Sequence, residues 1–455
     1  MSELDSDWVD DLPPAFQDYR QPGRRIEEVE CIIPDLAGMS RGKSMPFYKF
    51  RPDITFFLPI SLFYQTITGD YVNRVETDVE FDVVLRPDMA TASAVPWADD
   101  VTLQVINDLE TRAGEPLAVA PRNVLKRVLG HYRDRGWRPV VAPELEFYLI
   151  TPNVDPNEPI QPPVGRTGRK GAGRQAYSMV AVDEYGPVID MIYAYAEAQG
   201  LTIDTLIQEG GAGQIEINLK HGDPLDLADQ VFYFKRAIRE AALKNGTFAT
   251  FMAKPMRDEP GSAMHIHQSV VDAKTGENVF SRADGEPTAA FRHFIGGSQC
   301  HLISTIPLLA PFVNSYRRFT AGMSAPVNVE WAADNRSTGL RIPNSPTSAR
   351  RVENRIVGID SNPYLAIAAS LACGYLGMVE EIEPRPEAVG EVGKEGAVLP
   401  RNLTEALDGF KNDQTVRDVL GEDFCGLYEA VKKAELMEFE REISPWEREH
   451  LLLNV

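Results

Sequence analysis

Cysteine is scarce in this sequence, and no two cysteines stand close together. The 455-residue chain has four, and none belongs to a CxxC pair: Cys31, Cys300, Cys373 and Cys425. This spacing excludes a disulfide framework and a zinc ribbon. We expect four buried, unpaired thiols, which predicts a reducing and therefore cytoplasmic location.

Long apolar runs and a surplus of basic residues are also absent. The longest apolar stretches, such as 305–313, are too short and too interrupted by proline to cross a bilayer. The first residues, MSELDSDWVDDLPPAF, lack the basic start and apolar core of a signal peptide. Lys and Arg number 46 against 67 Asp and Glu, a formal charge of −21. We therefore expect no nucleic-acid partner and no membrane partner, whereas cationic ligands are permitted.

The usual nucleotide-binding loops are missing as well. There is no GxxxxGK[ST] loop, no kinase motif set and no paired-glycine fingerprint between a strand and a helix. The segment GRKGAG at 168–173 is a basic, glycine-rich surface loop. A nucleotide bound here must therefore be held by metal ions and arginines.

The chain divides into three predicted parts. Residues 1–24 are acidic and lack periodicity, which predicts disorder. Residues 25–117 contain short strand-like runs separated by turns, such as Val29–Pro34, Phe81–Arg86 and Thr102–Asn107. A helix begins near Pro121, and from residue 118 to 455 strands alternate with helices such as 225–244 and 363–380. The fold class is therefore predicted to be α+β.

Four predicted strands of the larger part share an unusual polar face. Every second side chain of a strand lies on the same side. The segments are 138–150, 213–219, 262–270 and 350–356, and one side of each is apolar. The other side carries mainly carboxylates, imidazoles and arginines. These are, in chain order, Glu144, Glu146, Glu216, His265, His267, Ser269, Arg351, Glu353 and Arg355. One such strand alone fits a half-solvated sheet better than a site. Four together indicate function.

Carboxylates converge if these strands lie side by side. Glu209, before the Gly210–Gly211 turn, adds an acid to Glu144, Glu146, Glu216 and Glu353. Like charges at that density oppose ionisation unless cations neutralise them. Oxygen ligands with one or two imidazoles suit Mg²⁺ or Mn²⁺ and leave positions for phosphate oxygens. The pattern predicts a centre that holds divalent cations.

Arginines supply the other half of the predicted site. They follow the carboxylate segments in a cluster: Arg317, Arg318, Arg336, Arg341, Arg351 and Arg355. The planar guanidinium group binds carboxylates and phosphates in a way that lysine does not. Cations combined with arginines are what phosphoryl transfer requires, since positioning and charge neutralisation dominate its catalysis.

These segments resemble the glutamine synthetase superfamily, in order and spacing, from about residue 26 to the C-terminus. The motifs are PELEFYL at 143–149, EGGAGQIE at 209–216, GSAMHIHQS at 261–269, NRSTGLRIP at 335–343 and ARRVENR at 349–355, with NSYRRF at 314–319 and SPWEREHLL near the end. The resemblance implies a small N-terminal β-grasp-like domain (25–117) and a catalytic domain (118–455) with a curved antiparallel sheet flanked by helices. It also implies a carbon–nitrogen ligase that uses ATP to join glutamate to an amine.

The same resemblance implies a role for each site residue. Two or more Mg²⁺ or Mn²⁺ ions would be held in two sets, one formed by Glu146, Glu209 and Glu216 and the other by Glu144, His265 and Glu353. Glutamate would be bound by Gly261, Arg318 and Arg355. ATP would be bound by His267, Ser269, Arg336, Arg341 and Arg351. Arg336, Glu209 and Arg355 would be catalytic.

The sequence departs from the ammonia-using members at the amine end. Ser324, in GMSAP at 322–326, stands where they carry an acidic flap residue. The segment FLPISLFYQT at 57–66 stands where the ammonia-using members carry a second acid, and it has apolar residues instead, including Phe63 and Tyr64. The segment LAGMSRGKSMP at 36–46 resembles the γ-glutamyl-amide branch of the superfamily. These residues predict an organic amine, such as a polyamine or alkylamine, and a γ-glutamylpolyamine synthetase. Glutamine synthetase using ammonium is the alternative, and a non-catalytic relative is another. The resemblance also implies a homo-oligomer, a dodecamer with active sites between subunits.

Overall fold

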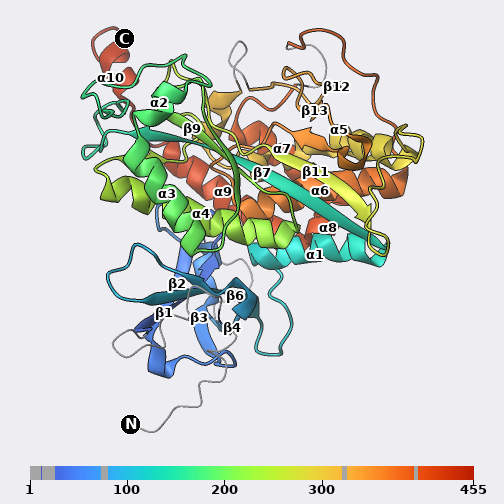
Figure 1. Cartoon of the computed structure of the whole chain (residues 1–455), viewed down its shortest axis with the longest axis horizontal. Coiled ribbons are helices and arrows are strands. Elements are labelled where there is room, and N and C mark those ends of the chain that lie inside the picture. The colour runs from blue at the N-terminus through green and yellow to red at the C-terminus, as the bar shows by residue number, and fades with distance from the viewer. Residues whose placement is uncertain (1–11, 13–25, 73–79, 320–324, 394–397) are drawn as a thin grey trace.

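The computed structural model describes Leu12 and residues 26–72, 80–319, 325–393 and 398–455. Most of the acidic segment 1–24, and with it the prediction of disorder, lies outside the described residues, as does Ser324. The described chain forms two sheets and a layer of helices (Figure 1).

The smaller sheet is built from the N-terminal part of the chain. Its strands run in the order β2-β1-β6-β4-β3, and β5 pairs with β6. They are β1 (Glu28–Pro34), β2 (Ser40–Pro46), β3 (Phe56–Pro59), β4 (Asp82–Pro87), β5 (Ser93–Ala94) and β6 (Thr102–Glu110). The pair β1 and β6 is parallel, and the other pairs are antiparallel. Three strands predicted from the sequence are therefore confirmed as β1, β4 and β6.

The larger sheet carries the predicted site. Its order is β12-β13-β14-β11-β7-β9-β8, and β10 pairs with β7. The strands are β7 (Trp137–Ile150), β8 (Ile203–Gln208), β9 (Gln214–Leu219), β10 (Phe248–Thr250), β11 (Ile266–Asp272), β12 (Trp331–Ala333), β13 (Leu340–Ile342) and β14 (Val352–Asn354). Only β12 and β13 pair in parallel among these strands. The predicted antiparallel sheet is confirmed apart from this edge pair.

Two of the predicted strands are shorter than expected. The strand predicted for 262–270 begins at Ile266, and the one predicted for 350–356 covers only Val352–Asn354. Just before β11 the chain still bonds to β7, because the carbonyls of Ala263 and His265 accept from β7 N–H groups at 3.0 Å and 2.9 Å. Its own N–H groups donate to loops instead: Ser262 to the Ala253 carbonyl at 2.8 Å and Met264 to the Val357 carbonyl at 3.0 Å. His265 therefore precedes the strand.

Several of the described helices pack on the larger sheet. The described helices are α1 (Pro121–Asp134), α2 (Met179–Asp183), α3 (Gly186–Ala198), α4 (Pro224–Lys244), α5 (Ala289–Leu309), α6 (Pro363–Glu380), α7 (Leu403–Asn412), α8 (Gln414–Leu420), α9 (Glu422–Phe439) and α10 (Pro445–Leu451). Of these, α1 and α4 pack against β7, and α2 packs against β8. Proline at the first turn favours the starts of α1, α4 and α6, and Asp223 and Asn362 cap α4 and α6 by accepting backbone N–H bonds. Among the described helices, α6 is long and apolar enough to cross a membrane, but 89% of it is buried inside the protein, as in a core helix.

A buried ionic cluster joins the two sheets. Arg122, at the start of α1, contacts Asp229 of α4 at 2.8 Å, Asp88 at 2.8 Å and Asp108 of β6 at 2.5 Å. Tyr364 of α6 donates its hydroxyl to Asp229 at 2.6 Å. Figure 1 shows the consequence: α1 and α4 lie between the N-terminal sheet, drawn in blue, and the larger sheet. The proposed domain boundary at 117/118 falls just before α1.

Three cysteines behave as predicted, and one does not. Cys31, Cys373 and Cys425 are free and buried, whereas Cys300 is free but exposed. The prediction of burial for Cys300 is wrong because its side chain lies on the solvent side of α5, whose other face packs on α6.

Candidate active site

The polar faces of the larger sheet meet in one cleft of about 780 Å³. Every predicted metal ligand lines it: Glu144, Glu146, Glu209, Glu216, His265 and Glu353. Five of the predicted substrate-binding residues line it too: Gly261, Arg318, Arg336, Arg341 and Arg355. The structure therefore brings together residues that are up to 211 positions apart in the sequence (144 to 355).

Strand register explains this convergence. In the antiparallel pair of β7 and β9, Glu146 is directly opposite Glu216. In the pair of β11 and β14, His267 is opposite Glu353, and Arg341 of β13 is opposite Glu353 on its other side. Directly opposed residues on one face are neighbours, so the period of two places these groups within reach of one another.

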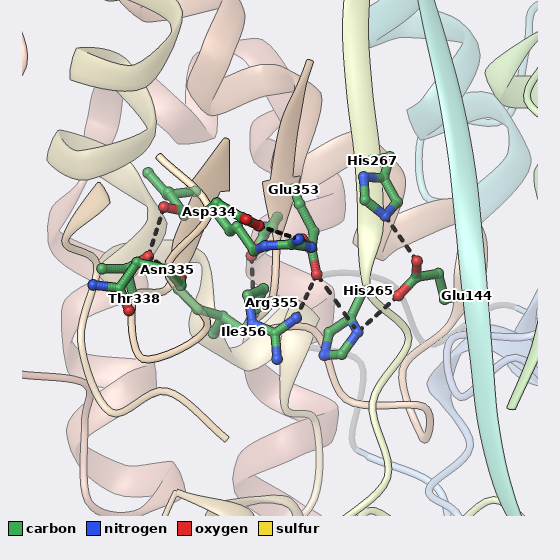
Figure 2. Close-up of polar contacts among 12 residues, drawn as sticks. Glu144, His265, His267, Asp334, Asn335, Thr338, Glu353, Arg355 and Ile356 are labelled. Carbon is green, nitrogen blue, oxygen red and sulfur yellow. Dashed lines mark hydrogen bonds and ion pairs between the residues drawn. The ribbon is translucent and has the colours of Figure 1, made fainter. Parts of the chain in front are cut away.

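His265 stands at the centre of the carboxylates (Figure 2). Its Nδ1 lies 3.0 Å from Glu144 Oε2, 3.8 Å from Glu146 Oε1 and 3.8 Å from Glu353 Oε1. His267 Nε2 lies 2.8 Å from the other oxygen of Glu144. Burial and then the positive charge of Arg355 lower the pKa of His265 to about 4, so the ring is neutral at pH 7, the form that binds metals.

The carboxylates divide into two electrostatic classes. Burial, followed by repulsion from neighbouring acids, raises the pKa of Glu146 to about 8 and that of Glu216 to about 9. Burial acts in the same direction on Glu144, but hydrogen bonds with His265 and His267 outweigh it and hold its pKa below the ordinary value. Glu146 and Glu216 thus carry protons at neutral pH without a cation. Because a cation must displace these protons, its affinity rises as the pH increases through about 8 to 9, the pKa values of Glu146 and Glu216.

The donor atoms fit divalent cations, in two groups of which one equals a predicted set and the other differs in one member from the second predicted set. Glu144, His265 and Glu353 offer ligand atoms within 4.8 Å of one another, and so do Glu146, Glu216 and His265. The first group equals a predicted set. In the second group His265 takes the place that Glu209 has in the predicted set, while Glu209 lines the same cleft. Buried acids that cannot all ionise are the environment in which a cation is stabilised.

The arginines differ in how firmly they are held. Arg318 is buried and donates to the carbonyls of Ile356 at 2.6 Å and Arg355 at 2.7 Å. Arg341 bridges Glu353 at 2.9 Å and Asp334 at 2.6 Å, and Arg355 contacts Glu353 at 2.5 Å. Arg336 is exposed in the cleft and makes no ion pair within the described part of the chain. Gly261 packs so closely that a Cβ would lie 2.7 Å from Arg318 Cγ.

A second pocket of about 700 Å³ adjoins the cleft and shares Glu144 and Asn218 with it. It is lined by three further residues predicted to bind ATP: His267, Ser269 and Arg351. Arg351 Nε donates to His267 Nδ1 at 3.1 Å, and His267 in turn contacts Glu144. The predicted ATP-binding residues are thus distributed over two connected pockets.

The predicted amine residues are not brought together by this chain. Ser324 lies outside the described residues. Phe63 and Tyr64 belong to a 3-10 turn (Ile60–Tyr64) of the N-terminal part and do not line the cleft. Phe63 is 0% exposed in the apolar core, so it presents no surface to an amine, and its assignment is corrected. Tyr64 is half-buried and stays a prediction for contact with another subunit.

Several cleft residues were not predicted. Tyr177, Ile207, Gln214, Glu391 and Val392 line the cleft. Gln214 had a sequence signal, since it shares the polar face of β9 with Glu216, and its amide donates to the Gly261 carbonyl at 3.0 Å. Tyr177 lies in a loop with φ of 65°, in the left-handed region, and is 67% exposed. No periodic pattern marks such a loop residue.

Comparisons with known proteins match the chain over nearly its whole length. The family described as "Glutamine synthetase, catalytic domain" matches residues 118–451. The gamma-glutamylputrescine synthetase of Escherichia coli K12 is 37% identical over 446 residues, covering 96% of this chain and 94% of that protein. A glutamate–isopropylamine ligase of a Pseudomonas species is 34% identical, covering 80% of each chain. The ligand-free structure of GmaS aligns with a TM-score of 0.79 at 25% identity, covering 94% of this chain and 97% of that one.

Proposed function

The chain belongs to the glutamine synthetase family, and on that premise we propose that it joins the γ-carboxylate of glutamate to an organic amine at the expense of ATP. One observation carries the proposal: acids, a neutral imidazole and arginines from distant segments line a single cleft. This combination neutralises phosphate charge and polarises a carboxylate, as a phosphoryl-activating ligase needs.

We assign glutamate binding to two arginines that line the cleft, Arg318 and Arg355. Arg318 uses two donors to hold the carbonyls of Ile356 and Arg355, and its remaining donors are available to the α-carboxylate. Burial lowers the pKa of Arg318 only to about 10, so it stays charged at neutral pH. Arg355 would contact the γ-carboxylate, and Gly261, which also lines the cleft, would contact glutamate without a side chain that would displace Arg318.

ATP is assigned to the two connected pockets. The nucleotide end fits the pocket lined by His267, Ser269 and Arg351, and the phosphates would reach Arg336 and Arg341 in the cleft. Two or more Mg²⁺ or Mn²⁺ ions, one held by Glu144, His265 and Glu353 and another by Glu146, Glu209 and Glu216, would act as Lewis acids that neutralise the phosphates and orient the carboxylate.

The reaction follows in two steps. A γ-carboxylate oxygen of glutamate attacks the γ-phosphorus of ATP, and the bond to ADP breaks to give γ-glutamyl phosphate. An unprotonated amine then attacks the acyl carbon, and phosphate leaves as the amide forms. Arg336 would stabilise the charge on the transferring phosphoryl group, and Glu209, whose pKa is raised by burial, would accept the amine proton.

An organic amine suits the cleft better than ammonium. Besides its charged groups the cleft contains apolar side chains from β8 and from loops: Ile207 of β8, and Ala325, Pro326, Val327 and Val392 of loops. Tyr177 adds an exposed aromatic ring. The relatives named for putrescine and isopropylamine point to the same class of nucleophile. We assign a polyamine or alkylamine as the substrate.

The choice of amine is tested by steady-state kinetics of glutamate-dependent ADP release. Each buried methylene contributes about 0.8 kcal/mol, so two or three favour putrescine, spermidine or an alkylamine over ammonium by roughly one to two orders of magnitude in kcat/KM. The measurement compares these amines with ammonium at equal concentration. A higher kcat/KM for ammonium would make the protein a glutamine synthetase, and no turnover with any amine would make it a non-catalytic relative.

A homo-oligomer would complete the site. The turn that holds Tyr64 lies in the N-terminal part, which α1 and α4 separate from the chain's own larger sheet (Figure 1). Its distance from the chain's own larger sheet supports a contact of this turn with a neighbouring subunit's cleft. We assign a ring-shaped homo-oligomer, a dodecamer, with active sites between subunits. The unpaired thiols fit a cytoplasmic location.

A further inference from the structure

A pocket of about 560 Å³ lies between the N-terminal sheet and α4, and it shares no lining residue with the catalytic cleft or its adjoining pocket. One wall is the loop 37–40 between β1 and β2, and the opposite wall is one face of α4. Segments 249–252, 312–314 and 360–361 of the catalytic part complete it. The pocket therefore sits where the two parts of the chain meet.

Three cations of α4 line this pocket: Lys235, Arg236 and Arg239. Lys235 and Arg239 are four residues apart and so share a helix face. Arg236 pairs with Glu30 of β1, with Nη2 3.1 Å from Oε1. Arg239 lies over the ring of Phe251, 4.8 Å from its centre, and forms no hydrogen bond or ion pair with the residues that the structure describes. Its side chain is exposed, so water rather than an acid of the described chain solvates its charge.

Among the described residues, Lys235 also has no acidic partner within hydrogen-bonding distance. Its Nζ donates to the carbonyls of Ile359 at 2.5 Å and Ser361 at 3.0 Å. Burial, and next the nearby charge of Arg239, lower the pKa of Lys235 to about 7. Two adjacent cations repel each other, and an anion between them would relieve the repulsion.

Asp360 is the one acid among the described lining residues. Its Oδ2 accepts a hydrogen bond from Ser315 at 2.6 Å. Burial raises the pKa of Asp360, while this hydrogen bond and the nearby charge of Lys235 oppose the shift. The chain has a formal charge of −21, yet no acid among the described residues forms an ion pair with Arg239. The excess positive charge at this pocket is therefore a local feature.

We propose that this pocket binds a small anion with carboxylate or phosphate oxygens, and that Arg239 and Lys235 are its cationic contacts. A guanidinium group supplies paired donors to either kind of oxyanion. The side chains of Phe232, Phe251 and Phe312 form apolar walls suited to a short carbon chain. Because the loop 37–40 closes the other side, the bound anion ties the N-terminal sheet to the catalytic part.

The test is calorimetric titration of the full-length protein with two probes, succinate and inorganic phosphate. Arg239→Gln is compared with the wild type and with Arg135→Gln, a control that removes an exposed arginine at the end of α1. We expect at least one probe to bind the wild type and the control equally, and to bind Arg239→Gln at least about tenfold more weakly, since a charged hydrogen-bonding partner is lost. Binding that depends on Arg239 for succinate alone or phosphate alone identifies which oxyanion the pocket takes. If neither probe binds Arg239→Gln more weakly than it binds the wild type, the proposal is overturned.

Thermal unfolding without added anion separates a binding role from a structural one. Arg239→Gln removes the repulsion of Lys235, so its melting temperature is expected to equal or exceed that of the wild type. A melting temperature well below that of Arg135→Gln would mean that the contact with Phe251 supports the fold, and it would contradict the proposal.

Discussion

Replacing Glu216 by glutamine is expected to abolish glutamate-dependent ADP release. Glu216 lies opposite Glu146 in the sheet and belongs to one of the two groups that fit a cation. Glutamine keeps the size of the side chain but cannot carry the negative charge that a divalent cation requires. Mutation of residues that only orient metal ligands lowers activity by about 10- to 100-fold. Removal of a direct ligand should therefore lower turnover by more than about 100-fold. The measurement is turnover at saturating glutamate, ATP, amine and Mg²⁺.

Glu115→Gln is the matched control, because Glu115 is exposed in the loop after β6. Glu146→Ala is expected to be inactive too, but it also leaves the buried Ala263 N–H without its acceptor at 2.7 Å, so stability must be checked alongside activity. Wild-type turnover in a folded Glu216→Gln or Glu146→Ala protein would contradict the metal assignment.

Replacing Arg336 by alanine is expected to lower kcat by about 1000-fold, at the lower end of what arginines contribute to phosphoryl transfer. KM for ATP should change by less than about tenfold, because the guanidinium acts mainly when charge redistributes in the transition state. Arg336 is exposed in the cleft and holds no described residue by an ion pair, so its removal should leave the fold unchanged.

Two comparisons make this result specific. Arg336→Lys should restore little activity, since lysine lacks the planar pair of donors. Arg401→Ala, which removes an exposed arginine just before α7, should behave like the wild type. An unchanged kcat with a raised KM in Arg336→Ala would make Arg336 a ground-state contact to phosphate.

The core of the site was predictable because strand geometry is periodic. Alternation in β7 and β9 places Glu144, Glu146 and Glu216 on one face, and the burial of Leu145 and Phe147 confirms the opposite face. Alternation specifies neither which strands are neighbours nor their register. The pairing of Glu146 with Glu216 was therefore known only from the structure.

The rest depended on tertiary contacts that a local pattern does not encode. The start of β11 was misplaced because the N–H groups of Ser262 and Met264 donate to loops, although the Ala263 carbonyl accepts from β7. Tyr177 and Glu391 reach the cleft from loops, where no period applies. Phe63 was misassigned for another reason. An aromatic residue in a predicted substrate segment is equally suited to the hydrophobic core, and the side chain of Phe63 is buried in that core.

The central claim is that the γ-carboxylate of glutamate is activated by phosphorylation and then transferred to an amine. Glutamate labelled with ¹⁸O in its γ-carboxylate tests this most directly, with mass spectrometry of the phosphate released in the presence of ATP, Mg²⁺ and putrescine. The account predicts that each phosphate formed carries one labelled oxygen and that γ-glutamylputrescine forms in equal amount. Phosphate without label, or label without the amide, would contradict it.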